Sequence, residues 1–157
     1  MAALRPGISA TDRAGVARLL SAGEAALFRR MPAAYQRHGL NVLRRLEAAG
    51  HDDADLLRAA LLHDVAKGSA IRLGHRVLIV LLDRFAPGAL AWLARDGVAG
   101  WRRPFYVNRS HAEIGAGLAR AAGATPRTIE LIHRHHDPPA PGDDEALRAL
   151  RGADANE

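Results

Sequence analysis

Eight histidines among 157 residues are the side chains in this sequence best suited to bind a metal or to take part in catalysis. The most informative is His63, which precedes Asp64 and lies about one helical turn before Lys67 in the apolar segment LLRAALLHDVAKG. At about 100° per residue, these three side chains fall in one sector of a predicted helix whose leucines cover its whole circumference. Burial of a carboxylate is costly unless it is paired or binds a metal. An ion pair with Lys67 would satisfy Asp64, but it leaves His63 on the same face unexplained.

The dipeptide His-Asp occurs twice more, and these copies show that the dipeptide alone is weak evidence for a functional site. One copy spans residues 51–52, where Asp52 is adequately explained as a helix cap. The other, at residues 136–137, ends a predicted helix just before two prolines. Only His63-Asp64 lies within a segment whose apolar pattern predicts a buried helix.

Four more predicted helices carry a His or an Asp on their inward, apolar faces. In chain order, these residues are His38, His111, His135, His136 and Asp154. Simpler explanations exist for some of them, since His38 lies at the edge of its apolar stripe and the helix dipole favours imidazolium groups near a helix C-terminus. Asp154 falls between Leu147 and Leu150 on an apolar face, where a carboxylate has no structural explanation. Inward His or Asp residues on five separate helices therefore favour a shared site.

The absence of cysteine decides how such a site could hold a metal. No disulfide framework and no thiolate zinc site can form, so any metal must be held by His, Asp or Glu. Imidazole and carboxylate ligands suit borderline or hard divalent ions such as Mn, Fe, Co or Zn. A metal would also neutralise the buried Asp64, which makes the position of that carboxylate tolerable.

The composition predicts a single all-α domain that positions these residues. The length suits one compact domain, and 48% apolar with 25% charged residues is typical of a soluble globular protein. Ala and Leu dominate while β-branched and aromatic residues are sparse, which favours helix over strand. We expect residues 1–30 to form an N-terminal helical extension packed on a helical bundle of residues 31–157. The predicted helices cover residues 11–21, 23–30, 32–49, 53–67, 75–86, 88–95, 110–122, 126–136 and 144–155, with loops around 97–109 and 137–144.

Hydropathy and charge narrow the compartment and the partners. No apolar run approaches the roughly 18 residues of a membrane span, and the N-terminus lacks the apolar core of a signal peptide. We therefore expect a cytoplasmic protein without a membrane partner. The formal charge of +5 suits an anionic ligand, but it is too diffuse to predict nucleic-acid binding. The positive charge is almost all arginine, because Lys67 is the only lysine in the chain.

Over about residues 31–157, the order of these residues resembles the HD-domain superfamily of metal-dependent phosphohydrolases. The family pattern is a first His on one helix, His-Asp on the next helix and a final Asp on the last. The matching residues here are His38, His63, Asp64 and Asp154. The resemblance implies that these four residues bind a metal and that the fold is an HD-like helical bundle.

Other parts of the sequence resemble particular members of this superfamily. HDVAK resembles the HD-I-G-K version, in which the lysine lies near the substrate phosphate, with Ala66 in place of the glycine. His111, His135 and His136 resemble the second-metal ligands of dinuclear members of the family. By this resemblance, Asp64 would bridge the two ions. Alternatively, one of the two adjacent histidines supports the other without binding, which would leave one metal or a looser pair. The absence of a GYP-type segment after residue 137 argues against the HD-GYP phosphodiesterases. The absence of Glu-Asp at the expected spacing after the His-Asp pair argues against guanosine-tetraphosphate hydrolases.

The resemblance implies a phosphomonoesterase or phosphodiesterase that acts on a nucleotide or a related small phosphate ester. One or two divalent metals, drawn from Mn, Fe, Co, Ni and Zn with Mg as a further candidate, would activate a water for attack. The catalytic residues would be Asp64, which holds the metals, and Lys67, which holds a phosphate oxygen. Phosphate recognition could extend to Arg72, Arg76 and Arg109, although the simpler interpretation of each is a solvated arginine.

Two other functions fit the same residues. Some HD-fold proteins hold a di-iron centre and are oxygenases, and a His-rich site is compatible with that chemistry. A degenerate HD domain could instead be a non-catalytic signalling module. Retention of all four family ligands argues against this second alternative, because such a module needs no metal ligands.

Overall fold

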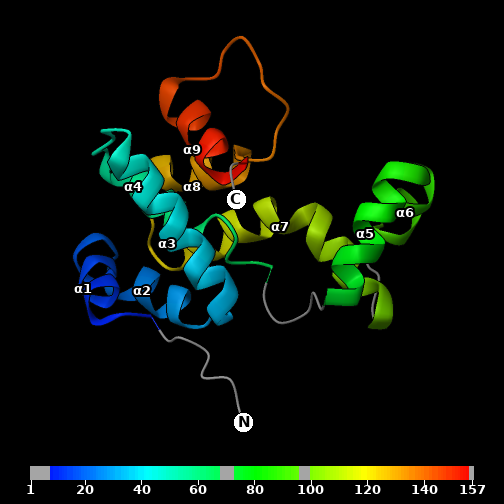
Figure 1. Cartoon of the computed structure of the whole chain (residues 1–157), viewed down its shortest axis with the longest axis horizontal. Helices are drawn as coiled ribbons and strands as arrows, with labels where there is room; N and C mark the ends of the chain where they lie inside the picture. Colours follow the sequence, from blue (N-terminus) through cyan, green and yellow to red (C-terminus); the bar gives the residue numbers. More distant parts are fainter. Residues whose placement is uncertain (1–7, 68–72, 96–99, 156–157) are drawn as a thin grey trace.

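The computed structural model describes residues 8–67, 73–95 and 100–155, and Figure 1 shows their arrangement. Within these ranges the regular elements are all helical and no strand occurs, which confirms the predicted all-α class. None of the helices there is both long and apolar enough to cross a membrane. The helices are α1 (Ala10–Leu19), α2 (Ala22–Arg29), α3 (Ala33–Ala48), α4 (Ala54–Leu62), α5 (Leu73–Phe85), α6 (Pro87–Leu93), α7 (Arg103–Ala121), α8 (Pro126–Arg134) and α9 (Glu145–Ala155), with a short 3-10 helix η1 (Gly100–Arg102) directly before α7.

Side-chain caps explain where two of the site-bearing helices begin. Helix α8 begins at residue 126 as predicted, because Thr125 accepts a hydrogen bond from the backbone N–H of Thr128 at 3.1 Å. At α4 the predicted cap is wrong by one residue. The carboxylate of Asp53, and not that of Asp52, accepts from the N–H of Leu56 at 2.8 Å.

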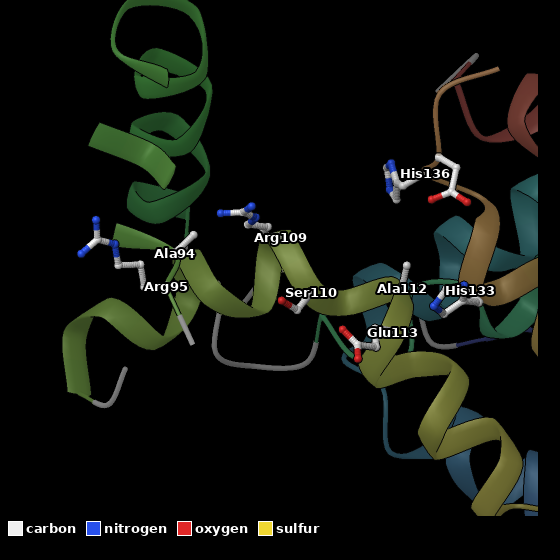
Figure 2. A pocket seen from close by; sticks show the side chains of 9 residues that line it. Ala94, Arg95, Arg109, Ser110, Ala112, Glu113, His133 and His136 are labelled. Atoms are coloured by element: carbon white, nitrogen blue, oxygen red, sulfur yellow. The ribbon is translucent and has the colours of Figure 1, made fainter. Parts of the chain in front are cut away.

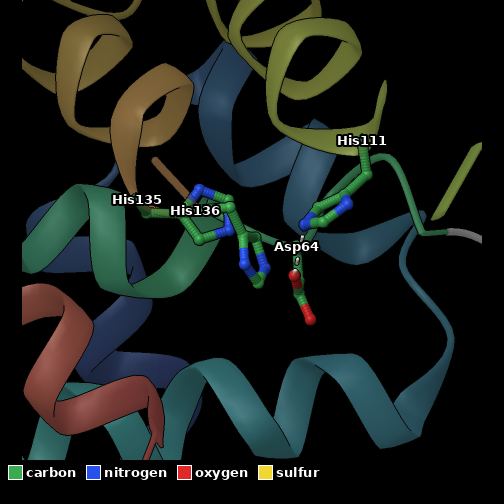
Figure 3. A group of neighbouring side chains, drawn as sticks. All are labelled: Asp64, His111, His135 and His136. Carbon is green, nitrogen blue, oxygen red and sulfur yellow. Dashed lines mark ion pairs between the residues drawn. The ribbon is translucent and has the colours of Figure 1, made fainter. Parts of the chain in front are cut away.

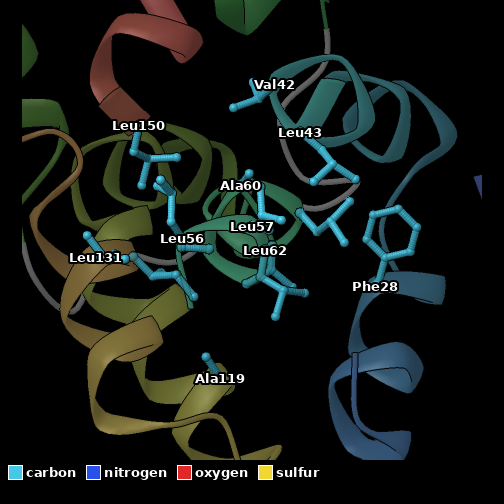
Figure 4. Close-up of a cluster of buried hydrophobic side chains, with 14 of the residues drawn as sticks. Phe28, Val42, Leu43, Leu56, Leu57, Ala60, Leu62, Ala119, Leu131 and Leu150 are labelled. Carbon is cyan, nitrogen blue, oxygen red and sulfur yellow. The ribbon is translucent and has the colours of Figure 1, made fainter. Parts of the chain in front are cut away.

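Helix α4 lies at the centre of the main bundle, packed by α3, α8, α9 and the two N-terminal helices. Its residues 59–62 are completely buried, so the predicted central position of this helix is confirmed. Figure 4 shows apolar side chains that converge on it, including Phe28 of α2, Leu131 of α8 and Leu150 of α9. Helices α1 and α2 thus contribute to the same core as the helices after residue 31.

Helix α3 approaches α4 closely at Gly39. A Cβ atom added there would lie 3.0 Å from the carbonyl oxygen of Leu61, which is tighter than ordinary van der Waals contact. The absence of a side chain at this position lets the two backbones come together. Gly39 directly follows His38, so the close approach brings His38 next to the end of α4, where His63 lies.

Helix α4 ends at Leu62, earlier than the predicted end at residue 67. The next residues form tighter turns, in which the N–H of Val65 bonds to the carbonyl of Leu62 and the N–H of Lys67 bonds to that of Asp64. His63-Asp64 is therefore buried at the end of a helix, and not within it as predicted. Bonds to the third residue back wind the chain more tightly than an α-helix, so they change the directions in which the following side chains point.

Residues 103–109 form the beginning of α7, although the sequence predicts a loop there and a helix only from 110. Pro104 occupies the first turn, where its missing N–H costs nothing. Phe105 is only 1% exposed and packs with Ile79 of α5 and Leu93 of α6. Packing of this aromatic side chain therefore outweighs the Gly, Pro and Asn content that favours a loop.

Helix α7 connects the main bundle to a smaller unit formed by α5 and α6 (Figure 1). Its N-terminal end carries Phe105 in the small second core, whereas Ala116 and Ala119 near its C-terminal end belong to the main core. His111 lies between these two ends. The middle of α7 thus faces the space between the two units, which is where the pocket described below opens.

Candidate metal centre

Seven His and Asp side chains meet at one place in the main bundle. Asp64 is at their centre, because it belongs to two groups of possible ligands. Within each group, the ligand atoms all lie within 4.8 Å of one another. The residues come from α3 (His38), the end of α4 (His63 and Asp64), α7 (His111), the end of α8 (His135 and His136) and α9 (Asp154). We refer to one side of Asp64 as the carboxylate half, which consists of His38, His63 and Asp154. We refer to the other side as the imidazole half, which consists of His111, His135 and His136.

The three side chains of the carboxylate half contact one another directly. Nε2 of His38 lies 2.9 Å from Oδ1 of Asp154 and 3.0 Å from Nε2 of His63. The same carboxylate oxygen lies 3.4 Å from Nε2 of His63. His63 is completely buried, whereas the side chains of His38 and Asp154 are 17% and 19% exposed. The ligand atoms of the carboxylate half are therefore hydrogen-bonded to one another.

Charge in the carboxylate half favours a bound proton. Burial acts to lower the pKa of His63, but the hydrogen bond to Asp154 and the charge of Asp64 together raise it above its ordinary value. Burial acts to raise the pKa of Asp154, but hydrogen bonds from His38 and His63 hold that pKa well below its usual range. An imidazolium between two carboxylates explains both shifts. A metal ion that enters this half must take the place of that proton.

In the imidazole half, ring nitrogens face the centre without a hydrogen-bond partner. Nε2 of His111 and Nε2 of His135 are buried, and no described residue forms a hydrogen bond with either atom. The ring centroids of His111 and His136 lie 4.6 Å apart, and those of His135 and His136 lie 4.3 Å apart. Figure 3 shows the three rings gathered near Asp64, whose Oδ1 is 3.7 Å from Nε2 of His111. Buried ring nitrogens without partners are uncommon in folded proteins, and a metal ion would satisfy both of them.

Burial keeps the imidazole half neutral. Burial, with the nearby charge of Lys67, lowers the pKa of His111 to about 4. Burial also lowers the pKa of His135 to about 2, with further lowering from His63 and His136. The pKa of His136 is lowered by burial and by Lys67. Because neutral imidazole is the form that binds metals, this half can accept an ion without first losing a proton.

Backbone carbonyls fix the orientation of three of the rings. In each of them Nδ1 donates to the carbonyl oxygen three residues earlier: His63 to Ala60 at 2.9 Å, His111 to Asn108 at 2.7 Å and His135 to Ile132 at 2.6 Å. A carbonyl oxygen can only accept, so Nδ1 carries a proton and Nε2 is directed to the centre. Outer hydrogen bonds of this kind hold ligating rings in place in metal sites.

Asp64 is shared by the two halves and is ion-paired with Lys67, which is the simpler of the two explanations that the sequence allows for a buried carboxylate here. Nζ of Lys67 lies 2.7 Å from Oδ1 of Asp64, whose side chain is 3% exposed. The carboxylate oxygens also lie 3.8 Å from Nε2 of His38, 3.8 Å from Nε2 of His63 and 3.7 Å from Nε2 of His111. Burial acts to raise the pKa of Asp64, but His63 and Lys67 lower it to about 2. An ionised carboxylate therefore lies at similar distances from the ring nitrogens of both halves.

These residues fit a divalent metal ion. The donors are imidazole nitrogens and carboxylate oxygens, and the chain has no cysteine that could add sulfur. An ion would satisfy the unpartnered ring nitrogens of His111 and His135 and would neutralise the buried Asp64. The cluster can therefore hold a metal, as the sequence predicts.

A pocket of about 540 Å³ opens beside the imidazole half, between α6, α7 and the end of α8 (Figure 2). Its polar and charged lining consists of Arg95, Arg109, Ser110, Glu113, His133, His136 and Asp137. Because His136 belongs to both the pocket and the imidazole half, the pocket leads to the metal centre. Its size is in the range of pockets that hold small-molecule ligands.

The predicted phosphate-binding arginines divide into three cases. Arg109 lines the pocket, in agreement with its predicted proximity to the site. Arg76 is on α5, but its side chain lies outside the described part of the chain, and Arg72 lies outside it altogether. Arg95, which follows α6, lines the pocket and was missed by sequence reasoning. No pattern near Arg95 marks it, because only the packing of α6 on α7 brings it there.

Comparisons of this chain with known protein families, with curated proteins and with solved structures found no significant match. What the site can do follows from its geometry. A cluster that can hold metal ions can activate a water molecule. The polar pocket beside the cluster is lined by two arginines and two carboxylates, so it offers charged groups of both signs to a polar ligand.

Proposed function

We propose that this protein is an HD-type, metal-dependent phosphohydrolase that acts on a nucleotide or a related small phosphate ester. The observation that carries the proposal is the position of Asp64, a buried carboxylate shared by two groups of metal-ligating side chains. Two ions that share a carboxylate can hold both the attacking and the leaving oxygens of a phosphoryl group. The order of the ligands along the chain supports the same class.

The bound ions, from Mn, Fe, Co, Ni, Zn or Mg, would supply a water activated for attack and positive charge for the phosphoryl oxygens. The chain's own residues prepare this chemistry. Backbone bonds at Nδ1 direct Nε2 of His63, His111 and His135 to the centre. Burial of the same rings excludes bulk water, which strengthens electrostatic interactions inside the site.

Lys67 is suited to bind a non-bridging phosphate oxygen. Its Nζ is 2.7 Å from Oδ1 of Asp64, and its side chain is 18% exposed, so the ammonium group lies between the buried cluster and solvent. A metal held by Asp64 would share the charge of this carboxylate and weaken its hold on Lys67. The ammonium group of Lys67 would then be available to stabilise negative charge on the phosphoryl group.

The pocket beside His136 is the proposed substrate-binding site. Arg95 and Arg109 line it, together with the carboxylates of Glu113 and Asp137. Arginine side chains in a cleft can hold the oxygens of a phosphate group through charge-assisted hydrogen bonds. His136 is the exposed member of the imidazole half, so the substrate would reach the centre from this side, with its phosphoryl group near Lys67 and Asp64.

The decisive test is a phosphatase and phosphodiesterase screen across nucleotides and small phosphate esters, run separately with Mn, Co, Fe, Ni, Zn and Mg. We expect metal-dependent hydrolysis by the wild-type protein and none by Asp64→Asn. Metal content is measured on the same samples. Metal binding without hydrolysis of any phosphate ester would reject the phosphohydrolase, and failure to bind any divalent metal would favour a non-catalytic HD module.

A di-iron oxygenase is the second candidate, because five imidazole rings surround the single shared carboxylate. This nitrogen-rich ligand set, formed by His38, His63, His111, His135 and His136, also suits iron. The discriminating measurement combines iron content, the visible absorption spectrum and oxygen consumption with candidate organic substrates. An iron-dependent visible spectrum with oxygen consumption and no phosphatase activity would replace the phosphohydrolase by this candidate.

A further inference from the structure

One buried carboxylate outside the metal centre connects the two helices that carry opposite halves of it. The side chain of Asp143, which lies just before α9, is only 2% exposed. Its Oδ1 accepts from Nη2 of Arg134 at 2.7 Å, and its Oδ2 accepts from Nη1 of Arg151 at 2.5 Å. Arg134 is the last residue of α8, and Arg151 lies on α9. A single carboxylate thus ties the end of α8 to α9.

Further hydrogen bonds make this connection rigid. Oδ2 of Asp143 also accepts from the backbone N–H of Ala140 at 2.8 Å, which fixes the loop between the two helices. Nη2 of Arg151 donates to the carbonyl oxygen of Arg134 at 2.9 Å, so Arg151 holds both the side chain of Asp143 and the backbone of α8. Charge-assisted bonds of this kind are stronger and more directional than neutral ones.

The positions of the two arginines relate this cluster to the metal centre. Arg134 directly precedes His135 and His136 of the imidazole half, and Arg151 lies about one helical turn before Asp154 of the carboxylate half. We propose that Asp143 is a positioning residue that sets the distance between the two halves of the metal centre. This inference rests on the proposed function for the presence of metal ions, and it assigns Asp143 no contact with substrate or metal.

The fold itself does not need this carboxylate to bring α8 and α9 together. Ile132 of α8 and Leu147 and Leu150 of α9 are at most 1% exposed and belong to the main core. Apolar packing of this kind holds helices together but tolerates small shifts between them. Metal coordination requires ligand atoms to be placed within about 0.5 Å. The cluster around Asp143 therefore adds precision that the metal centre uses.

The test compares Asp143→Asn with Asp144→Asn, which is the same change at the adjacent residue. Asp144 is half exposed, pairs with Arg127 and caps α9 by accepting from the N–H of Leu147. Asparagine preserves that capping role, so this variant is a matched control. Binding of Mn²⁺ and Co²⁺ is measured by isothermal titration calorimetry and metal analysis. The absorption spectrum of the Co²⁺ form reports ligand geometry, and thermal melting reports folding.

We expect Asp143→Asn to stay folded at room temperature, to bind at least one of its ions about 10–100-fold more weakly and to show an altered Co²⁺ spectrum. Asp144→Asn should bind both ions like the wild type. If folded Asp143→Asn matches the wild type in both affinity and spectrum, the inference is wrong. If Asp143→Asn does not fold, Arg134→Lys and Arg151→Lys decide the matter. They keep the charge but lose the forked geometry, so they must weaken metal binding if the inference holds.

The same measurements separate this inference from the proposed function. Wild-type protein that binds no divalent metal would overturn both. Wild-type protein that binds metal but hydrolyses no phosphate ester would reject the phosphohydrolase. In that case weaker binding and an altered spectrum in Asp143→Asn would still support the positioning role, because neither readout depends on catalysis.

Discussion

The two halves of the metal centre differ in what their ring nitrogens contact. In the carboxylate half, Nε2 of His63 lies within 3.4 Å of both His38 and Asp154, so the ligand atoms satisfy one another. In the imidazole half, Nε2 of His111 and Nε2 of His135 are buried without a hydrogen-bond partner among the described residues. The ligand atoms of one half are hydrogen-bonded to one another, whereas two ring nitrogens of the other half have no such bond among the described residues.

This difference predicts how the two halves fill with metal. The raised pKa of His63 means that an ion must displace a proton from the carboxylate half. The lowered pKa values of His111 and His135 mean that the imidazole half is already deprotonated. We therefore expect the first ion to enter the imidazole half, and the second to enter the carboxylate half with proton release.

The largest expected effect comes from removing the residue that the halves share. Asp64→Asn should lose high-affinity binding of both ions, because among the described residues the shared carboxylate is the only charged ligand grouped with the imidazole half. Loss of the ions removes several kcal/mol of transition-state stabilisation, which corresponds to a decrease of about 10³-fold or more in kcat/KM. Metal analysis and steady-state kinetics measure both consequences.

Asp52→Asn is the matched control for this substitution, since it changes the exposed Asp of another His-Asp dipeptide. It should retain both ions and full activity. Retention of one tightly bound ion by Asp64→Asn would show that the halves are independent, and the shared role of the carboxylate would have to be abandoned.

Removal of one ligand from each half should have a smaller, half-specific effect. His135→Gln should leave one ion bound, in the carboxylate half, and His38→Gln should leave one ion bound, in the imidazole half. We expect the affinity of the affected half to decrease by about 100-fold, at the upper end of the range for residues that support metal ligands. Calorimetric titrations at two pH values identify which ion is lost, because only the ion of the carboxylate half should release a proton.

His133→Gln provides the control for both variants. His133 is an exposed neighbour of the imidazole half and belongs to neither group of ligands. The His133→Gln variant should bind two ions with wild-type affinity. Equal loss of both ions in His135→Gln and His38→Gln would contradict the division into two halves.

The sequence predicts which His and Asp side chains gather in the candidate metal centre better than it predicts the helices that carry them. An Asp or His on an apolar face is visible without structure, because burial of a polar group needs a reason. That argument located His63 and Asp154. It placed His63-Asp64 inside a helix, however, because the tighter turns after Leu62 depend on tertiary contacts that helix periodicity does not contain.

Residues that reach the site through long-range packing left no comparable pattern. The beginning of α7 resembles a loop by composition, and it is a helix because Phe105 packs against α5 and α6. That packing places Arg95 beside the pocket. Asp143 lies in a polar segment rich in proline, where acidic residues are ordinarily exposed. Only the fold shows that this carboxylate is buried between two arginines.

The next prediction concerns which half the substrate approaches. Because the pocket opens beside His136, Arg109→Ala should raise KM about 10-fold with little change in kcat, which is the signature of lost uniform binding. Arg120→Ala, an exposed position on the same helix outside the pocket, should have no effect. Steady-state kinetics on the best phosphate ester measures both. A decrease in kcat with unchanged KM would place Arg109 at the reacting group instead.

The smallest expected effect is on the stability of the metal-free protein as pH changes. The raised pKa of His63 stabilises the fold below the unfolded value of 6.5, and this contribution is lost as pH rises through the folded pKa. The pKa values of His111 and His135 are lowered to about 4 and about 2. Below pH 6.5 the unfolded chain therefore binds protons that these residues do not bind in the folded state. Tm should then be highest near pH 6.5 and fall on both sides, by roughly 2–4 °C per kcal/mol in a chain of this size.

The two sides of this maximum belong to different halves, so single substitutions separate them. His135→Gln should reduce the decrease of Tm between pH 6.5 and pH 4, a range that lies above 3.8, the unfolded pKa below which the contribution of Asp64 begins to be lost. His63→Gln should reduce the decrease above pH 6.5. Added metal should also reduce the decrease above 6.5, because an ion takes the place of the proton on His63. Thermal melts followed by circular dichroism, with chelator and with metal, test all three expectations. If both variants changed the same side of the maximum, proton binding would not distinguish the carboxylate half from the imidazole half.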